Sequence, residues 1–101
     1  MKLLKIEKSF RAEKRFVAIF QKEDGKLKKV HFGLRNPKLG TYIDHKDKKL
    51  RKNYRARHER DLRTEKNKQG LGSGALSYYL LWGDSTNLQT NIKEYKKRFN
   101  L

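Results

Sequence analysis

The spacing of apolar residues predicts strands in the first third of the chain. Between residues 3 and 10 apolar side chains alternate loosely with charged ones, which is typical of a half-exposed strand that includes Phe10. Residues 16–20 are β-branched and aromatic, as in a strand with at least one buried face. The Asp24-Gly25 pair is a hairpin signal, and the apolar pattern resumes over 27–32. We therefore expect a three-stranded antiparallel meander.

A long basic helix is expected next. Residues 33–40, which hold the only proline, Pro37, predict a loop, and 41–43 predict a short strand or an extended lead-in. Asp44 or Asp47 can cap a helix that runs to about Leu62. Its apolar stripe has i+4 spacing: Leu50, Tyr54, His58 and Leu62. Because nearly all its other side chains are charged, we expect a narrow buried seam and a wide basic face.

The last third of the chain carries the densest apolar run. Residues 63–72 lack periodicity and predict a mobile surface loop. Ser73 is expected to cap an apolar helix over 74–82 that ends at Gly83. Asp84 or Ser85 is expected to cap a final helix whose apolar positions are Leu88, Ile92, Tyr95 and Phe99. The order β-β-β-α-α-α predicts an α+β fold, with three helices packed on one face of the sheet.

Composition bounds the class of protein. The chain has 101 residues, 27 Lys and Arg against 11 Asp and Glu, and a formal net charge of +16. It divides into 1–40 with +8, 41–69 with +6 and 70–101 with +2, which we interpret as parts of one domain over 1–101. The absence of cysteine excludes disulfides and thiolate zinc sites. Apolar runs too short for a membrane span or a signal peptide predict a protein that is not secreted.

Three blocks of sequence resemble a known family. They are VHFG (30–33), DHKD leading into RKNYRARHERDL (44–62), and GALSYYLLWGDST with NI and YKKRF (74–99). In this order they resemble a family of small basic proteins of large double-stranded DNA viruses of algae and protists. The loop at 68–73 departs from the Pro or Ala that members often carry before the apolar helix. The resemblance implies a viral origin and a location in the virion or in the host nucleus or cytoplasm, and it transfers no catalytic residue.

The charge predicts a polyanionic partner. Solubility of a small domain needs a net charge of only about 2–8, and +16 is well above that. We expect a weakly sequence-specific, salt-dependent nucleic-acid-binding protein, with DNA favoured over RNA, that contacts phosphates through the basic helix and the basic strand surface. The candidate residues are Lys48, Arg51, Lys52, Arg55, Arg57, Arg60, Lys66 and Lys68. The alternative is a minor structural or assembly component of a virion that binds acidic protein surfaces.

Other chemistry has weaker support. A metal nuclease built on His45 and His58 lacks the usual ligand spacings, and His58 also falls on the apolar stripe. The glycine-rich residues 70–74 lack the ending of a nucleotide loop, which favours a flexible linker. The aromatic residues between 78 and 82 could stack bases, but core packing is favoured. We therefore expect no enzyme activity, no cofactor or metal, no membrane contact and no small-molecule substrate.

Overall fold

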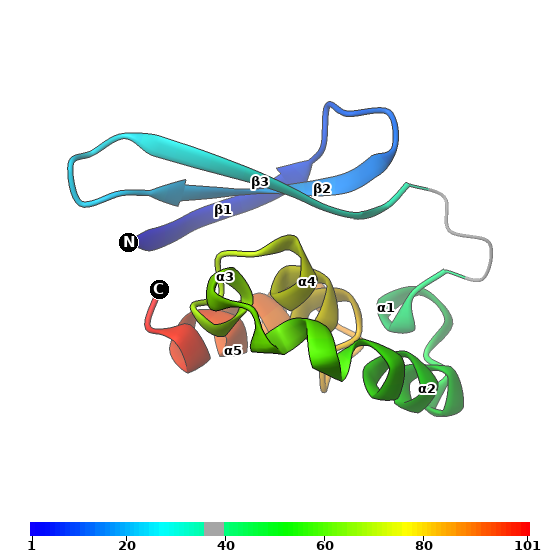
Figure 1. Ribbon diagram of the computed structural model, residues 1–101. Coiled ribbons are helices and arrows are strands. Elements are labelled where there is room, and N and C mark those ends of the chain that lie inside the picture. Colours follow the sequence, from blue (N-terminus) through cyan, green and yellow to red (C-terminus); the bar gives the residue numbers. More distant parts are fainter. Residues whose placement is uncertain (36–39) are drawn as a thin grey trace.

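A computed structural model describes residues 1–35 and 40–101, and the first of these segments forms an antiparallel sheet. Strands β1 (Lys2–Lys8), β2 (Lys14–Gln21) and β3 (Leu27–Leu34) lie in the order β1-β2-β3 (Figure 1). The β2–β3 turn closes with a hydrogen bond from the Lys22 N–H to the Lys26 carbonyl, and Gly25 adopts a φ of 86°. This confirms the predicted meander and its turn.

Two strand boundaries differ from the prediction. β1 ends at Lys8, so Phe10 lies in the β1–β2 loop instead of in the strand. β3 continues through Gly33 to Leu34, which pairs with Lys14, and glycine tolerates the positive φ of 77° that the chain takes at Gly33. Arg35 and Gly40 lie outside the helices and strands, as the loop predicted over 33–40 requires, and residues 36–39, including Pro37, lie outside the described residues.

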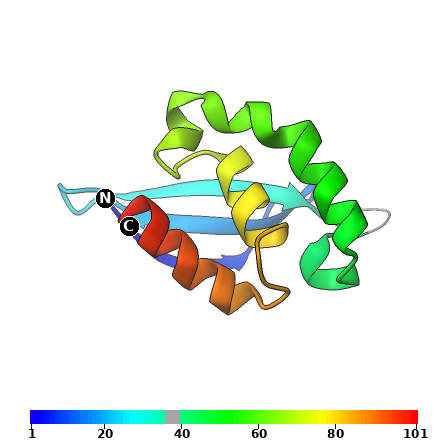
Figure 2. The ribbon, with the colours of Figure 1, turned by 90° about the horizontal axis from the view of Figure 1, so that it is seen from below.

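The helices follow the sheet along the chain and lie against one of its faces (Figure 2). They are α1 (Tyr42–His45), α2 (Lys48–His58), the 3₁₀ helix η1 (Glu59–Arg63), α3 (Glu65–Lys68), α4 (Ser73–Leu76), the π-helix η2 (Ser77–Leu81) and α5 (Leu88–Phe99). A three-stranded sheet with helices on one face is the α+β fold that the sequence predicts. Among the described residues, no helix combines the length and apolarity that crossing a membrane requires.

The basic helix is divided into more pieces than the sequence predicts. The expected strand or lead-in at 41–43 is wrong, because Tyr42 begins the single turn α1. Lys46 adopts a left-handed φ of 60°, which ends α1 and separates it from α2. The expected mobile loop over 63–72 contains α3, whose N-cap is Thr64. The predicted single helix is therefore replaced by α2 and η1, and α3 follows them closely along the chain.

The caps of the last helices also differ from the prediction. α4 and η2 together cover the predicted apolar helix, but the N-cap position is taken by Gly72, and Ser73 is the first helical residue. The cap of α5 is neither Asp84 nor Ser85: the Asn87 side chain accepts a hydrogen bond from the Thr90 N–H. A loop of several capping residues gives each of them a similar sequence signal, so the choice among them depends on the path of the chain.

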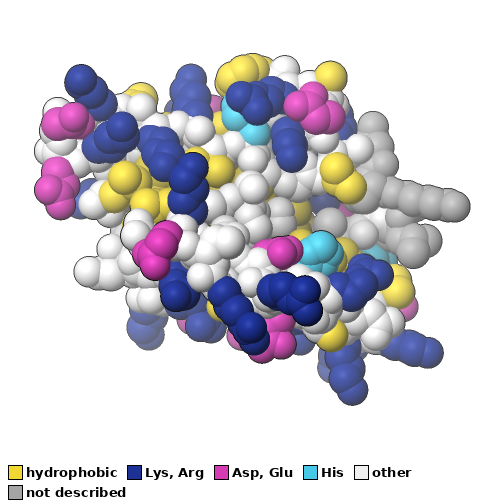
Figure 3. Space-filling model, in the orientation of Figure 1, with side chains coloured by type: hydrophobic (Ala, Val, Ile, Leu, Met, Phe, Trp, Pro, Cys, Tyr) yellow, Lys and Arg dark blue, Asp and Glu magenta, His cyan; other side chains and the backbone are white. Residues whose placement is uncertain are grey.

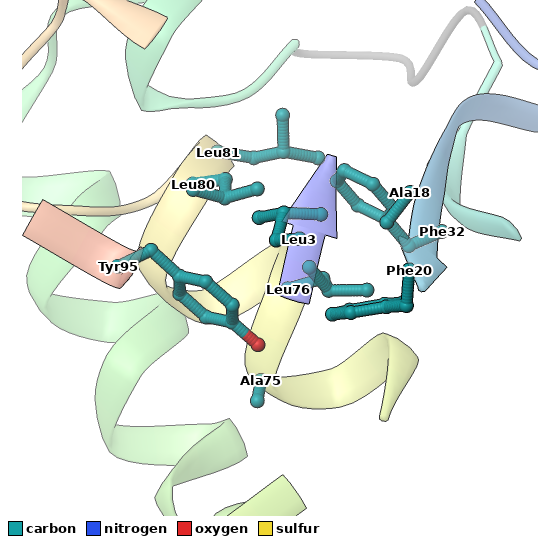
Figure 4. Close-up of a cluster of buried hydrophobic side chains, with 9 residues drawn as sticks. All are labelled: Leu3, Ala18, Phe20, Phe32, Ala75, Leu76, Leu80, Leu81 and Tyr95. Carbon is teal, nitrogen blue, oxygen red and sulfur yellow. The ribbon is translucent and has the colours of Figure 1, made fainter. Parts of the chain in front are cut away.

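The core lies between the sheet and the C-terminal helices (Figure 4). Its buried members come from all three strands, α4, η2 and α5: Leu3, Ala18, Phe20, Phe32, Ala75, Leu76, Leu80, Leu81 and Tyr95. The Tyr95 hydroxyl donates a hydrogen bond to the Gly70 carbonyl at 2.6 Å, which satisfies the one polar atom that this ring brings into the core. The basic helix thus packs against the apolar last third of the sequence.

Candidate nucleic-acid interface

Helix α2 starts at Asp47, one of the two caps proposed from the sequence. The Asp47 carboxylate accepts hydrogen bonds from the backbone N–H groups of Lys49 at 2.9 Å and Leu50 at 3.2 Å. The stripe of Leu50, Tyr54 and His58 is half-buried along α2, and Leu62 continues it in η1 against the core. The predicted seam is therefore confirmed, and it fixes which side chains of α2 point away from the domain.

Two arginines of the predicted binding set point toward the domain instead of toward solvent. Arg51 donates from Nε to the Gly83 carbonyl at 2.7 Å and from a terminal nitrogen to the Asp84 carboxylate at 2.6 Å. Arg55 donates to the Trp82 carbonyl at 3.1 Å. Only 24% of the Arg51 side chain and 23% of the Arg55 side chain are exposed. These two cations are largely occupied by the protein itself.

The two arginines meet the C-terminal end of η2. The last carbonyls of a helix have no partner within it and carry partial negative charge, so a guanidinium donor there stabilises the helix end. The Arg55 guanidinium also lies 4.4 Å from the centre of the Tyr78 ring, a cation–π contact. We call Arg51 and Arg55 the arginine anchor, because they join α2 to the turn that follows η2.

That turn is itself held by a buried amide. The Asn91 side chain, 4% exposed, donates to the Leu80 carbonyl at 3.0 Å and the Ser85 carbonyl at 2.7 Å, and accepts from the Ser85 N–H at 3.1 Å. A Cβ on Gly83 would lie 2.1 Å from the Tyr79 carbonyl oxygen, so only glycine fits there. No periodic pattern links Asn91 to these backbone groups, so the sequence analysis does not reveal this arrangement.

The other six predicted cations are exposed. They are Lys48 and Lys52 and Arg57 on α2, Arg60 on η1, and Lys66 and Lys68 on α3. We call these six residues the basic helix face. Within the described part of the chain none of them lies within 4.0 Å of a carboxylate oxygen. Lys and Arg side chains are numerous over the helices in the lower half of Figure 3.

Most of the positive charge is unpaired. Leaving out Lys38, which is not described, 26 of the 27 Lys and Arg side chains can be placed. Four of these contact a carboxylate: Lys5, Arg15, Arg51 and Arg55. The remaining described cations are free to neutralise phosphates, and this neutralisation drives binding because it releases the counterions condensed on a nucleic acid.

The aromatic side chains near α2 pack on one another. The Tyr54 ring lies between Trp82, at 4.3 Å and nearly parallel, and His58, at 4.2 Å. Burial raises the pKa of Tyr54 to about 12. Tyr78 is buried and Tyr79 half-buried. These rings pack within the domain, as the favoured interpretation of the sequence expected.

A groove of about 430 Å³ lies between α2 and the end of β3. Its lining includes Tyr54, Arg57 and His58 on one side and Leu34 on the other. Because His58 and Trp82 stack on the two faces of the Tyr54 ring, neither face of that ring is free for a base. Its contribution to the interface is therefore Arg57, which belongs both to the groove and to the basic helix face.

The histidines of the nuclease hypothesis have separate partners. His58 Nδ1 lies 2.9 Å from the Asp61 carboxylate, and the ring stacks on Tyr54. His45 Nδ1 accepts the Asp47 backbone N–H at 2.9 Å, and its ring lies 5.3 Å from that of Trp82. In the residues that the structure describes, no three His, Asp or Glu side chains form a group that could hold a metal ion.

The glycine-rich segment 70–74 accommodates a side chain instead of forming a flexible linker. The Asn67 amide oxygen accepts the Ala75 N–H at 2.9 Å, and its nitrogen donates to the Asp61 carbonyl at 2.6 Å. A Cβ on Gly72 would lie 2.1 Å from the Asn67 amide oxygen, and one on Gly74 would lie 2.8 Å from its nitrogen. The side chain that caps α4 therefore comes from Asn67 in α3, which the sequence pattern does not reveal.

Sequence reasoning missed one exposed aromatic residue among cations. Phe10 is 74% exposed in the β1–β2 loop, and its ring contacts His31 and lies beneath Lys29. The available signal was its position after the last alternating residue of β1, between Ser9 and Arg11. Because the alternation of apolar and charged residues includes Phe10 in the strand, it does not predict this exposure.

Comparison with known proteins identifies a family but no characterised relative. No curated protein and no solved structure matches the chain. One family model matches residues 4–58, more than half of the chain, from β1 to the last residue of α2. The chain therefore belongs to the family of unknown function DUF5754.

Proposed function

We propose that this protein binds nucleic acid, with DNA favoured over RNA, through phosphate contacts from the basic helix face and without catalysing a reaction. The observation that supports the proposal best is the state of the six cations: each is exposed and contacts no carboxylate of the described residues. Cations in this state lose no ion pair within the domain when they bind a phosphate. Their attraction for a polyanion is therefore fully available.

The form of the face favours phosphate contact over reading of bases. The 11 residues of α2 span about 16 Å at the helical rise, enough to follow several phosphates of one strand. Apart from the cations of α2, Asn53 is the exposed side chain suited to reading a base edge. Lysine ammonium groups act as flexible point charges and carry little geometric specificity. We therefore expect weak sequence preference. In the viral setting that the sequence resemblance implies, the protein would organise DNA.

The test is a titration of duplex DNA at several salt concentrations. If about six phosphates are contacted, affinity should fall roughly a thousandfold between about 50 and 200 mM salt. Single-stranded DNA and RNA of matched length show which nucleic acid is preferred. An affinity that does not change with salt would contradict the electrostatic mechanism. A stoichiometric complex with an acidic protein that survives nuclease treatment, together with weak DNA binding, would favour the assembly role instead.

A further inference from the structure

The sheet has one face that no helix of the described residues covers. All helices lie on the opposite side, as both ribbon views show (Figures 1 and 2). Ala18 and Phe20 of β2 point into the core, so the alternate residues Val17 and Ile19 point outward. Val17 and Ile19 are nevertheless only 3% and 6% exposed. Side chains of the neighbouring strands and loop must therefore cover this outer sheet face.

The partners of Val17 and Ile19 in the ladder identify the outer sheet face. Val17 pairs with Glu7 and His31, and Ile19 pairs with Lys5 and Lys29. Lys5 and Glu7 form an ion pair at 2.8 Å, so the charge of each is neutralised by the other. Lys29 has no such partner among the described residues.

The Phe10 ring lies at this face against His31. It meets His31 edge to face, with ring centres 4.6 Å apart and planes at 87°. The loop that carries it is held by Ser9, whose hydroxyl lies 2.7 Å from His31 Nδ1 and accepts the Arg11 N–H at 3.0 Å. The Ser9 N–H donates to the Arg15 carbonyl at 3.0 Å. A ring that is 74% exposed and still positioned by its neighbours loses little freedom when a ligand stacks on it.

The charges around Phe10 are mainly positive. The Lys29 ammonium group lies 5.8 Å from the centre of the Phe10 ring. The pKa of His31 is below its ordinary value, first because of desolvation and then because of Arg11 and Lys29. The neighbourhood therefore disfavours further positive charge and attracts an anion.

We propose that the outer sheet face binds unpaired nucleic acid, with one base stacked on Phe10 and the adjacent phosphates contacted by Arg11 and Lys29. This inference rests on the proposed function and adds a second surface, opposite the basic helix face. Stacking requires a base whose face is free, which a duplex does not present. A protein partner fits this surface less well, because a standard interface buries about 800 Å² per side around an apolar centre. Here the exposed apolar side chains Phe10 and Leu27 are separated by Lys29, which lies between Leu27 and His31, the residue that Phe10 contacts, along β3.

The test compares three variants of the full chain on two ligands, a short oligothymidylate and a DNA duplex. Phe10→Ala should weaken oligothymidylate binding at least about fivefold and leave duplex binding within about twofold, because the duplex is held by the basic helix face. Phe10→Trp should retain the affinity. Leu27→Ala is the matched control, because Leu27 is 56% exposed and pairs with the outward-facing Gln21, but it has no aromatic ring. It should change neither affinity.

The other outcomes separate the inference from the proposed function. If the wild-type protein binds duplex and Phe10→Ala changes neither ligand, or both equally, the stacking inference is overturned and the proposed function stands. If the wild-type protein binds neither ligand, the proposed function is overturned and the inference with it. If Phe10→Ala abolishes binding of an acidic protein while oligothymidylate binding is unchanged, this face is a protein-docking surface and the inference is wrong.

Discussion

Arg55 and Lys52 lie within one turn of α2 and carry the same charge, yet the fold uses them differently. Arg55 is 23% exposed and donates to a carbonyl of the turn after η2, whereas Lys52 is exposed and has no carboxylate contact among the described residues. The same contrast separates Arg51 from Lys48. A count of cations in the sequence therefore overstates the charge that α2 offers to a partner.

The difference follows from what each side chain does with its hydrogen bonds. A guanidinium can occupy several acceptors at once, and the arginine anchor uses this to satisfy the carbonyls of Trp82 and Gly83. A lysine in solvent exchanges water and counterions freely and loses little when it meets a phosphate. Variants of the two groups should consequently affect different properties: stability for the anchor and affinity for the basic helix face.

The largest effect on stability is expected from removing the arginine anchor. The double variant Arg51→Ala, Arg55→Ala leaves the carbonyls of Trp82 and Gly83 without donors and removes the cation–π contact to Tyr78. It should lower the free energy of unfolding by about 3 kcal/mol, measured by urea denaturation. The control Lys48→Ala, Lys52→Ala should stay within about 0.5 kcal/mol of the wild type. Equal losses in both doubles would remove the distinction between the two groups.

A somewhat smaller loss is expected when the turn beneath the anchor is disturbed. Asn91→Ala deletes three hydrogen bonds of a buried side chain and leaves the Leu80 carbonyl unpaired. Unfolding should become easier by about 2 kcal/mol, again by urea denaturation. Adding Asn91→Ala to the anchor double should cost less than it does alone, because the two act on the same turn. Strict additivity would show that the anchor does not depend on Asn91.

The sequence predicted the elements better than it predicted the site. Alternation in the first third and the four-residue spacing of Leu50, Tyr54 and His58 are local signals, and the strands and the seam follow them. The inward orientation of Arg51 and Arg55 depends instead on hydrogen bonds to carbonyls about thirty residues away in sequence. Periodicity alone places Arg55 at the flank of the seam and says nothing of an acceptor.

The glycine-rich segment and Phe10 show the same limit. Gly72 and Gly74 suggested flexibility, but the Asn67 amide fills the space that their side chains would take. Phe10 continued the alternation of β1, yet the strand ends two residues earlier and the ring is exposed. In both cases a contact between segments decides the outcome, and no local pattern reports it.

Arg15 is a third arginine that binds a group of the domain, and it allows a pH test of the contrast between such arginines and the exposed cations. Arg15 donates two hydrogen bonds of 2.7 Å to the Asp44 carboxylate, and these bonds, with those from Thr41, hold the pKa of Asp44 well below its ordinary value of 3.8. As the pH falls, the Asp44 carboxylate is therefore protonated in the unfolded chain before it is protonated in the folded protein. The stabilisation from this carboxylate is fully present above pH 3.8 and is lost progressively as the pH falls below that value.

Asp44→Asn measures the size of that effect. Since the carboxylate is partly exposed, the variant should lose about 1 kcal/mol of stability at neutral pH. Its stability should also decline less steeply than that of the wild type when urea denaturation is repeated at acidic pH. If the free energy of unfolding falls with acidic pH as steeply in the variant as in the wild type, the Arg15–Asp44 pair does not contribute to stability.

The smallest effect is expected from a single exposed lysine. Lys66→Ala on α3 should leave stability within about 0.5 kcal/mol and reduce the slope of log affinity against log salt for duplex DNA by about one unit. Lys93→Ala on α5, an exposed lysine outside the basic helix face, is the matched control and should leave the slope unchanged. A slope that falls equally in both variants would indicate binding by overall charge.

The most direct test of the central claim compares two triple charge reversals in one salt-series titration with duplex DNA. Lys48→Glu, Lys52→Glu, Arg60→Glu changes the basic helix face, and Lys93→Glu, Lys96→Glu, Lys97→Glu changes exposed positions of α5. Each reversal alters the charge by two, so both proteins fall from +16 to +10. If the basic helix face holds the DNA, the first variant should lose roughly a hundredfold in affinity and about half of the salt dependence, because three of the six cations remain, and the second much less. Equal losses would contradict the account, because net charge would then explain the binding without any face.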